Sequence, residues 1–307
     1  MKNFSNKISK EQATDALLRS GYLLEGRLYA FLDRREYYVE TNVVYPDPDS
    51  GKSRELDLQA ITSLSAGPRE FDRVHAVLLI ECVNNLQPIA FVTKKPQVEF
   101  LHHYDVKLAG LPVKISIDGN YWNYLPVYLE MDKYHHYCKG RVATQFCSFT
   151  KKKRKNIQEW MATHIEEHFD CFRKLSASVE YFIDEQFKNS NLLRLKNVNI
   201  EFYYPVVVVQ GELLDARPSK GSVNLINANH IQYRQSGLVG TVPEDYQIDV
   251  VTERFFPKYI EIIEQEISKT ARLLRRRSAT VRKSIDEIVR HTRIIRPPEK
   301  IRAALEF

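Results

Sequence analysis

The chain has 307 residues, of which 43% are apolar and 11% aromatic. It is therefore long enough to bury the core of one large or two ordinary domains, and its composition excludes a disordered tail. No apolar stretch reaches the roughly 18 residues of a membrane span, the first residues contain no hydrophobic signal core, and the four cysteines include no CxxC pair. We expect a soluble, cytoplasmic protein with free thiols.

The net charge of +6 is concentrated in the second part of the chain. Residues 1–110 hold 14 Lys and Arg against 15 Asp and Glu, whereas residues 268–307 hold 12 against 4. Basic runs of this kind are either solvated helix faces or phosphate-binding surfaces. The candidate nucleic-acid-binding residues are Lys151, Lys152, Lys153, Arg154, Arg275, Arg276, Arg277, Arg282 and Lys283.

The first hundred residues combine helical and strand patterns. Residues 10–33 place apolar side chains at helical spacing, with an interruption at Gly21. Polarity then alternates as in strands, the turn sequence PDPDSGK separates the first two of them, and a nearly continuous apolar run indicates a central strand. Strands are expected at residues 37–45, 54–61, 74–83 and 89–93.

The rest of the chain adds two buried strands and two long helices. The strands are expected at residues 200–214 and 246–252, and the helices at 156–190 and 257–292, the second broken near Arg277. The pattern predicts an α/β (α+β mixed) fold with a central mixed sheet flanked by helices. We expect residues 1–130 to form a core and residues 131–307 a helical and β extension packed on it, with one continuous domain as the alternative.

The segment LLIECVNN, residues 78–85, ends a strongly apolar strand on a carboxylate. Burying an ionised carboxylate without a partner costs several kcal/mol or forces protonation. The position of Glu81 at the end of an apolar strand therefore needs a physical explanation. The preceding strand, RELDLQAI, carries Asp57 on its polar side. Together the two acids suit a hard divalent cation, although unrelated surface or capped carboxylates are the alternative.

A helix with GYLLEGRLYAFL, then RELDLQA, then LLIECVNN resembles the PD-(D/E)xK nuclease superfamily, the fold of restriction endonucleases and Holliday junction resolvases. The resemblance covers roughly residues 12–95. It implies a restriction endonuclease-like core in which Asp57 and Glu81 bind Mg²⁺ or Mn²⁺, Glu25 is a third acid and the backbone carbonyl of Cys82 contributes a ligand. In that family, the metal activates water for phosphodiester hydrolysis.

This sequence departs from the family pattern at Val83, where the family has a lysine that orients or deprotonates the attacking water. Three explanations compete. A lysine from elsewhere reaches the site, with Lys94 and Lys95, at the end of the next expected strand, as the nearest candidates. Alternatively, Gln59 or Asn84 positions water without taking its proton, or the fold binds nucleic acid without cutting it.

Other motifs allow metal binding. His164, Glu167 and His168 match the HxxEH pattern of inverted zinc peptidases, but apolar residues share their helical stripe, which favours packed histidines. Cys138 and Cys147 lack the tight spacing of a zinc knuckle, even with His135 and His136 beside them.

Two further segments contain polar residues in notable surroundings. Residues 133–155 mix histidine, aromatic and basic residues, which suits either single-stranded nucleic acid or a charged loop before a helix. Asp249 lies within the apolar IDVV sequence, so the burial argument made for Glu81 applies to it too.

The sequence favours a metal-dependent nuclease acting on DNA or RNA, in restriction, repair or phage defence. A homodimer or a partner subunit is compatible with this reading. The alternatives are a catalytically degenerate nuclease-fold module that binds nucleic acid or a protein, and a zinc hydrolase built on HxxEH.

Overall fold

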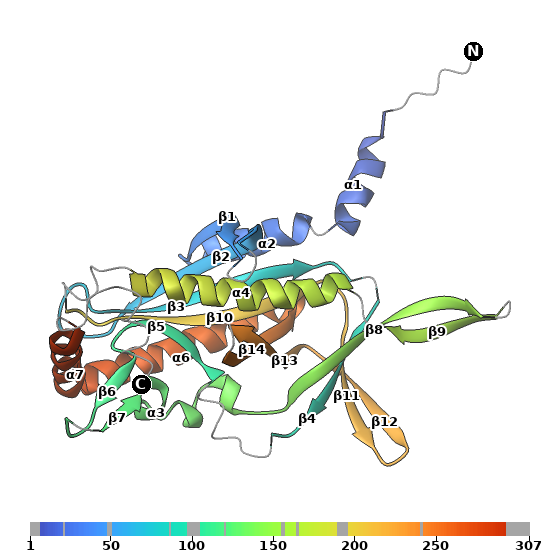
Figure 1. Ribbon diagram of the computed structural model, residues 1–307. Helices are drawn as coiled ribbons and strands as arrows, with labels where there is room; N and C mark the ends of the chain where they lie inside the picture. Colours follow the sequence, from blue (N-terminus) through green and yellow to red (C-terminus); the bar gives the residue numbers. More distant parts are fainter. Residues whose placement is uncertain are drawn as a thin grey trace.

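A mixed sheet of 12 strands lies at the centre of the computed structural model (Figure 1). The strands run in the order β1-β2-β3-β10-β14-β13-β8-β4-β11-β12, with β5 beside β10 and β9 beside β8. The prediction of a mixed α/β fold with a flanked central sheet is confirmed. The structure describes residues 7–20, 22–47, 51–85, 87–96, 105–119, 121–154, 157–163, 166–188, 196–239 and 242–292.

The strands of the large sheet include all four of those expected in the first hundred residues. Their bounds are β1 Tyr38–Pro46, β2 Ser53–Ser65, β3 Arg73–Val83, β4 Ile89–Lys94, β5 Lys107–Leu111, β8 Val142–Arg154, β9 Ile157–Thr163, β10 Asn199–Val209, β11 Leu213–Ser219, β12 Ser222–Ala228, β13 His230–Val239 and β14 Val242–Thr252. A separate two-stranded sheet joins β6 (Lys114–Ser116) to β7 (Trp122–Tyr124).

Helices cover both faces of the large sheet (Figure 1). Helix α4 packs on one face, which we call the α4 face, and α2, α6 and α7 pack on the other, the α6 face. The expected interruption near Gly21 and the expected break near Arg277 are both confirmed. The helices are α1 Lys10–Arg19, α2 Tyr22–Asp33, α3 Leu125–Tyr128, α4 Glu166–Lys188, α6 Phe256–Arg276 and α7 Ser278–Thr292.

The alternation of side chains along the central strands determines which residues reach each face. In β3, Leu78 and Ile80 belong to the apolar cluster beneath α6, whereas Val77 and Leu79 belong to the cluster beneath α4. Since successive residues of a strand point to opposite faces, Glu81 continues the series that faces α4.

The same alternation in β14 directs its acid, Asp249, to the face opposite to that of Glu81. Val251 packs on the α6 face, and Ile248 and Val250 on the α4 face. Asp249 therefore points toward α6. Because β3 and β14 both run parallel to β10, which lies between them, the two buried acids lie at the same end of the sheet on opposite faces.

The helix expected at 156–190 begins later than predicted. Residues 157–163 form β9, which pairs with β8 from Ser148↔Thr163 to Arg154↔Ile157, and α4 begins at Glu166. The hairpin partner decides this, because a short apolar run does not distinguish strand from helix by itself. Likewise, residues 142–154 are a strand, where a charged loop was one expectation.

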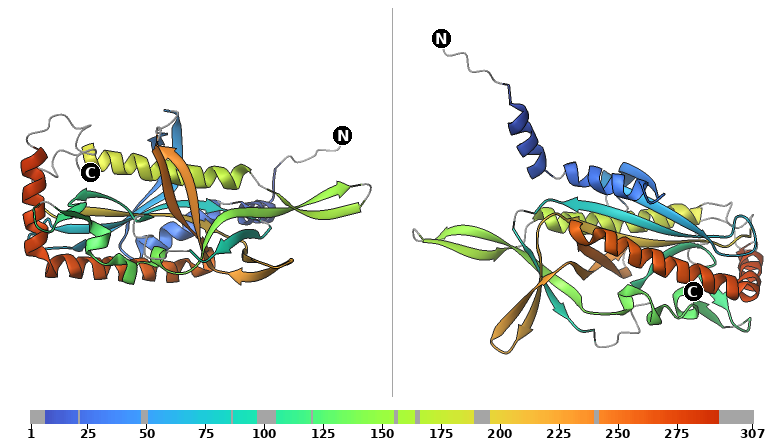
Figure 2. Two further views of the ribbon diagram at one scale, coloured as in Figure 1. Left: turned by 60° about the horizontal axis from the view of Figure 1, so that its bottom comes forward. Right: turned by 180° about the vertical axis from the view of Figure 1, so that it is seen from behind.

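The large sheet uses strands from both sides of the expected boundary at 130/131. Strand β3 pairs with β10 over 11 residue pairs, from Asn199↔Arg73 to Val209↔Val83. The β8–β9 and β11–β12 hairpins extend away from the sheet (Figure 2). Among the described helices, none combines the length and apolar character needed to cross a membrane.

Candidate metal site on the α4 face

Glu81 is buried on the α4 face near the carboxyl end of β3, with 4% of its surface exposed. Its Oε2 lies 2.9 Å from Nζ of Lys174. Its Oε1 is buried and, within the described residues, accepts no hydrogen bond. Glu81 therefore has one oxygen held by a cation and one oxygen without a hydrogen-bond partner.

Asp57 joins Glu81 where the β2–β3 ladder ends. The paired register stops at Leu58↔Ile80. Beyond that pair, Oδ2 of Asp57 accepts a hydrogen bond of 2.7 Å from the backbone N–H of Cys82. The Asp57 carboxylate thus takes a strand N–H that the ladder leaves free, and this bond fixes the carboxylate beside Glu81.

Lys174 is the cation of the site, and the sequence analysis did not identify it. It lies on α4, between the buried residues Phe172 and Leu175, and its side chain is partly exposed. The hydroxyl of Tyr45 donates a 2.7 Å hydrogen bond to the Lys174 backbone carbonyl. Arg54 of β2 also reaches Asp170 of α4, at 3.5 Å. The lysine is therefore held against the strand that carries Asp57.

The positive charge of Lys174 does not fully offset the cost of ionising the two buried acids. Burial, reinforced by the charge of Asp57, raises the pKa of Glu81 to about 8 despite the Lys174 ion pair. Burial also raises the pKa of Asp57. Burial alone would lower the pKa of Lys174, but Glu81, Asp57 and Asp170 together raise that pKa, so the ammonium stays charged. A second positive charge would stabilise both carboxylates in their ionised forms.

Glu25 approaches the pair from α2 but is less closely associated with it. Burial raises the pKa of Glu25, and the charge of Asp57 adds to this effect. Within the part of the chain that the structure describes, Glu25, Asp57 and Glu81 are not among the groups whose ligand atoms all lie within 4.8 Å of one another. The site consists of Asp57, Glu81 and Lys174, with Glu25 at its border.

The other predicted catalytic residues occupy different positions. Lys94 is exposed at the end of β4, and β10, β14, β13 and β8 separate β4 from β3 in the sheet, so Lys94 is not the nearest cation. Gln59 pairs with Leu79 and shares its face, next to the site. Asn84 follows the end of β3 and is half-buried. Val83 packs against the apolar cluster beneath α4.

Much of the predicted C-terminal basic surface makes intramolecular contacts. Arg275 donates to the Ser65 carbonyl, and Arg277 donates to the Tyr128 carbonyl. Arg282 pairs with Asp72, which is fully buried. The remaining two residues, Arg276 and Lys283, are exposed. Three of the five predicted cations therefore hold α6 and α7 to neighbouring segments.

The β8–β9 hairpin is the more exposed basic element, and we call it the basic arm. Lys151, Lys152 and Lys153 are exposed there, and Arg154 ends β8. Lys151 lies 4.9 Å from the ring centre of Trp160, which is 55% exposed. Basic and aromatic side chains are thus combined on one hairpin, with Trp160 coming from a segment that was expected to be helical.

The HxxEH motif falls largely outside the residues that the structure describes. His164 lies outside them, and the side chains of Glu167 and His168 are not described. His135 and His136 have metal-ligand spacing together with Glu266, but within the described ranges neither Cys138 nor Cys147 belongs to such a group. The HxxEH zinc hydrolase stays an untested prediction.

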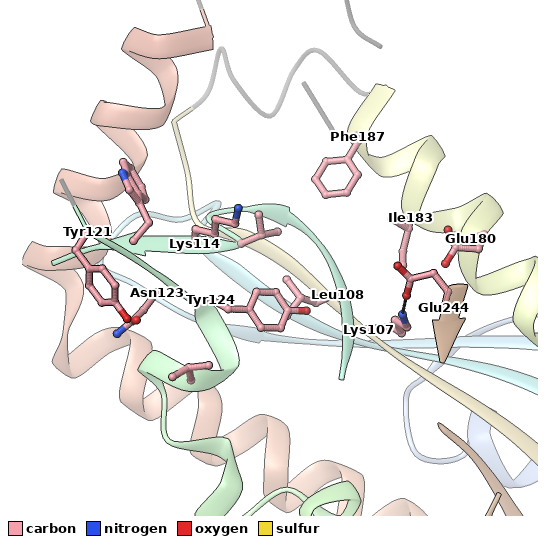
Figure 3. Close-up of a pocket in the computed structure, with 13 residues that line it drawn as sticks. Lys107, Leu108, Lys114, Tyr121, Asn123, Tyr124, Glu180, Ile183, Phe187 and Glu244 are labelled. Carbon is pink, nitrogen blue, oxygen red and sulfur yellow. Dashed lines mark hydrogen bonds and ion pairs between the residues drawn. The ribbon is translucent and has the colours of Figure 1, made fainter. Parts of the chain in front are cut away.

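A separate cavity of about 610 Å³ lies near the far end of α4 (Figure 3). An ion pair of 2.7 Å between Lys107 and Glu244 forms part of its wall, together with Tyr124 and Phe187. The residues of the α4-face site do not line it.

Comparison with protein-family models, with curated proteins and with solved structures gave no match. The functional assignment therefore depends on the chemistry of the described side chains.

Proposed function

We propose that the protein is a metal-dependent nuclease that hydrolyses phosphodiester bonds at Asp57, Glu81 and Lys174. The observation that carries this proposal is the 2.9 Å contact of Lys174 with Glu81, because it places a lysine where Val83 leaves none. The lysine comes from another element and replaces the charge that the motif lacks.

The two carboxylates suit Mg²⁺ or Mn²⁺. These hard cations prefer oxygen ligands and are commonly held by one or two carboxylates plus water and phosphate oxygens. Glu81 offers a buried oxygen that accepts no hydrogen bond among the described residues. Burial is the main cause of the raised pKa values of Asp57 and Glu81, and a bound cation would oppose it by favouring the ionised forms.

Each residue would have a distinct role. When bound, the metal ion would polarise the scissile phosphate and lower the pKa of water. Asp57, fixed by the Cys82 amide, and Glu81 would hold that ion. Lys174 would orient the attacking water and offset the charge that develops on the phosphate.

The basic arm is the best candidate for binding the nucleic-acid backbone near this site. The arm leads into α4, and Lys174 is eight residues after the first residue of α4, roughly 12 Å along the helix axis. In contrast, Arg282 pairs with Asp72, just before β3. Glu81 is eight residues beyond Arg73, roughly 26 Å along the strand.

The figures agree with this arrangement. The basic arm and α7 lie at opposite ends of the molecule (Figures 1 and 2). We therefore assign the phosphate contacts nearest the cleavage site to Lys151, Lys152, Lys153 and Arg154, with Trp160 available to stack on an unpaired base. DNA or RNA is the substrate class, and the arm favours single-stranded or distorted segments.

The test is cleavage of plasmid, single-stranded DNA and RNA in Mg²⁺ or Mn²⁺. We expect Asp57→Ala and Glu81→Ala to abolish cleavage, and Lys174→Met to lower kcat by about 10²- to 10⁴-fold without loss of nucleic-acid affinity. Lys188→Met is the matched control, because Lys188 is also on α4 and forms an ion pair, at 3.0 Å with Glu185. Lys94→Ala should be neutral.

Different outcomes identify the alternatives. Cleavage that survives both Asp57→Ala and Glu81→Ala contradicts the proposed site. Loss of cleavage in Lys94→Ala but not in Lys174→Met would restore Lys94 as the catalytic lysine. Tight, salt-sensitive binding without any cleavage would support the non-catalytic binding module.

A further inference from the structure

The α6 face of the sheet contains a second polar cluster, made of His136, His230, Asp249, Tyr259 and Glu266. Asp249 is fully buried and accepts three hydrogen bonds. His136 Nε2 lies 2.9 Å from Oδ2, and His230 Nε2 lies 2.6 Å from Oδ1. The Tyr259 hydroxyl donates to Oδ2 at 2.8 Å. Two imidazoles therefore point the same type of nitrogen at one carboxylate.

Glu266 fixes the orientation of His136 from the opposite side. Its Oε1 accepts the backbone N–H of His136 at 2.6 Å and lies 3.0 Å from Nδ1 of the same residue. Both ring nitrogens of His136 face carboxylates and donate to them, so a metal ion at Nε2 would displace the proton there while Nδ1 keeps its bond to Glu266. Histidines that bind metals commonly have such a carboxylate on the other ring nitrogen.

His135 does not belong to the same ligand set. Its Nδ1 accepts the backbone N–H of Tyr137 at 3.2 Å, so the neutral ring carries its proton on Nε2. Nε2 could give up that proton to a metal ion only if Nδ1 took one, which would break the bond from Tyr137. Of the two candidate groups among the described residues, His136, His230 and Asp249 offer three suitable donor atoms, all within 4.8 Å of one another.

A cavity of about 460 Å³ opens beside this cluster. His136, His230 and Glu266 line it, together with Lys139 and Lys269. His230 is partly exposed at 18% of its side chain, whereas Asp249 is not exposed. The cluster is thus closed on the sheet side and accessible from the cavity, whose two lysines favour an anionic ligand.

We propose that His136, His230 and Asp249 bind a divalent transition-metal ion of the Zn²⁺ type, with Glu266 as the carboxylate that orients His136. Two imidazoles and one carboxylate form a ligand set that zinc accepts, and three protein ligands leave a fourth position for water or an anion. That position would open toward the cavity, which His136 and His230 line. This site is distinct from the Mg²⁺ site proposed for Asp57 and Glu81, because the two lie on opposite faces of the sheet.

The primary test is Zn²⁺ titration of the full chain after removal of metal with EDTA, without nucleic acid present. We expect one high-affinity ion per chain, and Co²⁺ in its place should give the visible absorption of a tetrahedral or five-coordinate N/O site. Inorganic phosphate should change that spectrum. An unchanged spectrum would overturn the assignment of the fourth position to an anion.

Variants locate the ion. His230→Gln should weaken Zn²⁺ binding by more than about 100-fold, and Glu266→Gln by about 10- to 100-fold, the range found for carboxylates that orient a ligand. His230 is the preferred change, because it is partly exposed and a glutamine amide can still donate to Asp249; a thermal melt of His230→Gln in EDTA checks that this variant is folded. His291→Gln on the exposed face of α7 is the matched histidine control.

Three results would overturn the proposal. The first is the absence of stoichiometric Zn²⁺ binding, which would leave the cluster as a hydrogen-bonded ion network. The second is full binding by His230→Gln. The third is loss of binding in His168→Gln, which would move the ion to the HxxEH segment. Asp57→Ala should leave Zn²⁺ affinity unchanged, so failure here is independent of the nuclease proposal.

Discussion

The buried carboxylates on the two faces of the sheet have pKa values shifted in opposite directions. On the α4 face, Glu81 has Lys174 on one oxygen and no hydrogen bond to the other, and burial raises its pKa to about 8. On the α6 face, burial also opposes ionisation of Asp249, but His136 and His230 outweigh it and hold its pKa below the usual range. Both acids are buried to a similar degree, but only at Asp249 do neighbouring groups fully offset the cost that burial imposes on ionisation.

This difference bears on how each site would take up a metal ion. At Glu81 and Asp57 a cation would add the positive charge that the site lacks. At Asp249 a cation would have to displace the protons that the two histidines share with the carboxylate, so binding there should release protons. We expect Zn²⁺ affinity to fall at acidic pH.

The largest expected effect contrasts the two acids in metal-free protein. Asp249→Asn removes one partner of a buried ion network, so it should lower the free energy of unfolding by about 3–5 kcal/mol. Glu81→Gln removes a buried charge that Lys174 offsets only in part, so the free energy of unfolding at pH 8 should be unchanged or higher. Urea unfolding measures both, and equal destabilisation by the two changes would refute the contrast.

The pH dependence of stability should isolate Glu81. Its pKa is about 8 in the folded state against 4.5 ordinarily, so the folded state binds more protons between these values. Stability of the metal-free protein therefore falls as pH rises from 4.5 to 8, by at most about 1.4 kcal/mol per unit from this group, and then levels. Asp57 and Glu25 add in the same direction, and Lys174 stays charged.

The measurement is the difference in unfolding free energy between the unmodified chain and Glu81→Gln across this range. The difference should shift in favour of Glu81→Gln as pH rises. A constant difference would show that Glu81 has the same pKa in both states.

The basic residues provide a smaller contrast. Arg282→Ala leaves the buried Asp72 without its cation and should cost about 1.5–3 kcal/mol of stability. Joint replacement of Lys151, Lys152 and Lys153 by Ala should instead leave stability unchanged. It should reduce the salt dependence of single-strand binding by about two units in slope, at about 0.7 per phosphate contact.

Thermal melts and binding at several salt concentrations distinguish the two roles. Lys283→Ala is the control for an exposed cation on α7. An unaltered salt slope in the triple variant would exclude the basic arm as a phosphate-binding element.

Two tyrosine hydroxyls give the smallest contrast. Tyr259→Phe removes a hydrogen bond to the ionised Asp249 and should cost about 1.5–3 kcal/mol, whereas Tyr45→Phe removes a neutral one to the Lys174 carbonyl and should cost about 0.5–1.5 kcal/mol. Nuclease activity should fall only in Tyr45→Phe, since that tyrosine positions the lysine helix. Comparable losses of activity would contradict this separation.

The strands carrying Asp57 and Glu81 were predictable because their polarity patterns are local. Lys174 was not, since it is 93 residues from Glu81 in sequence. One signal was present: Lys174 borders the apolar stripe of α4 that contains Phe172 and Leu175. The α6-face cluster was only partly foreseen through Asp249, because its histidines come from distant segments that only tertiary packing brings together.

The pairing of β3 with β10 affects how the chain folds as it is made. Strand β3 ends at Val83, but its parallel partner ends at Val209 and the next strand, β14, ends at Thr252. At about 5–20 residues per second, synthesis of the chain between the ends of β3 and β10 takes roughly 6–25 s, during which the apolar edge of β3 lacks its native neighbour. Pairing of β3, β10 and β14 at the centre of the sheet is thus a late event between segments that are distant in sequence. The nascent protein should therefore depend on chaperones until β14 emerges.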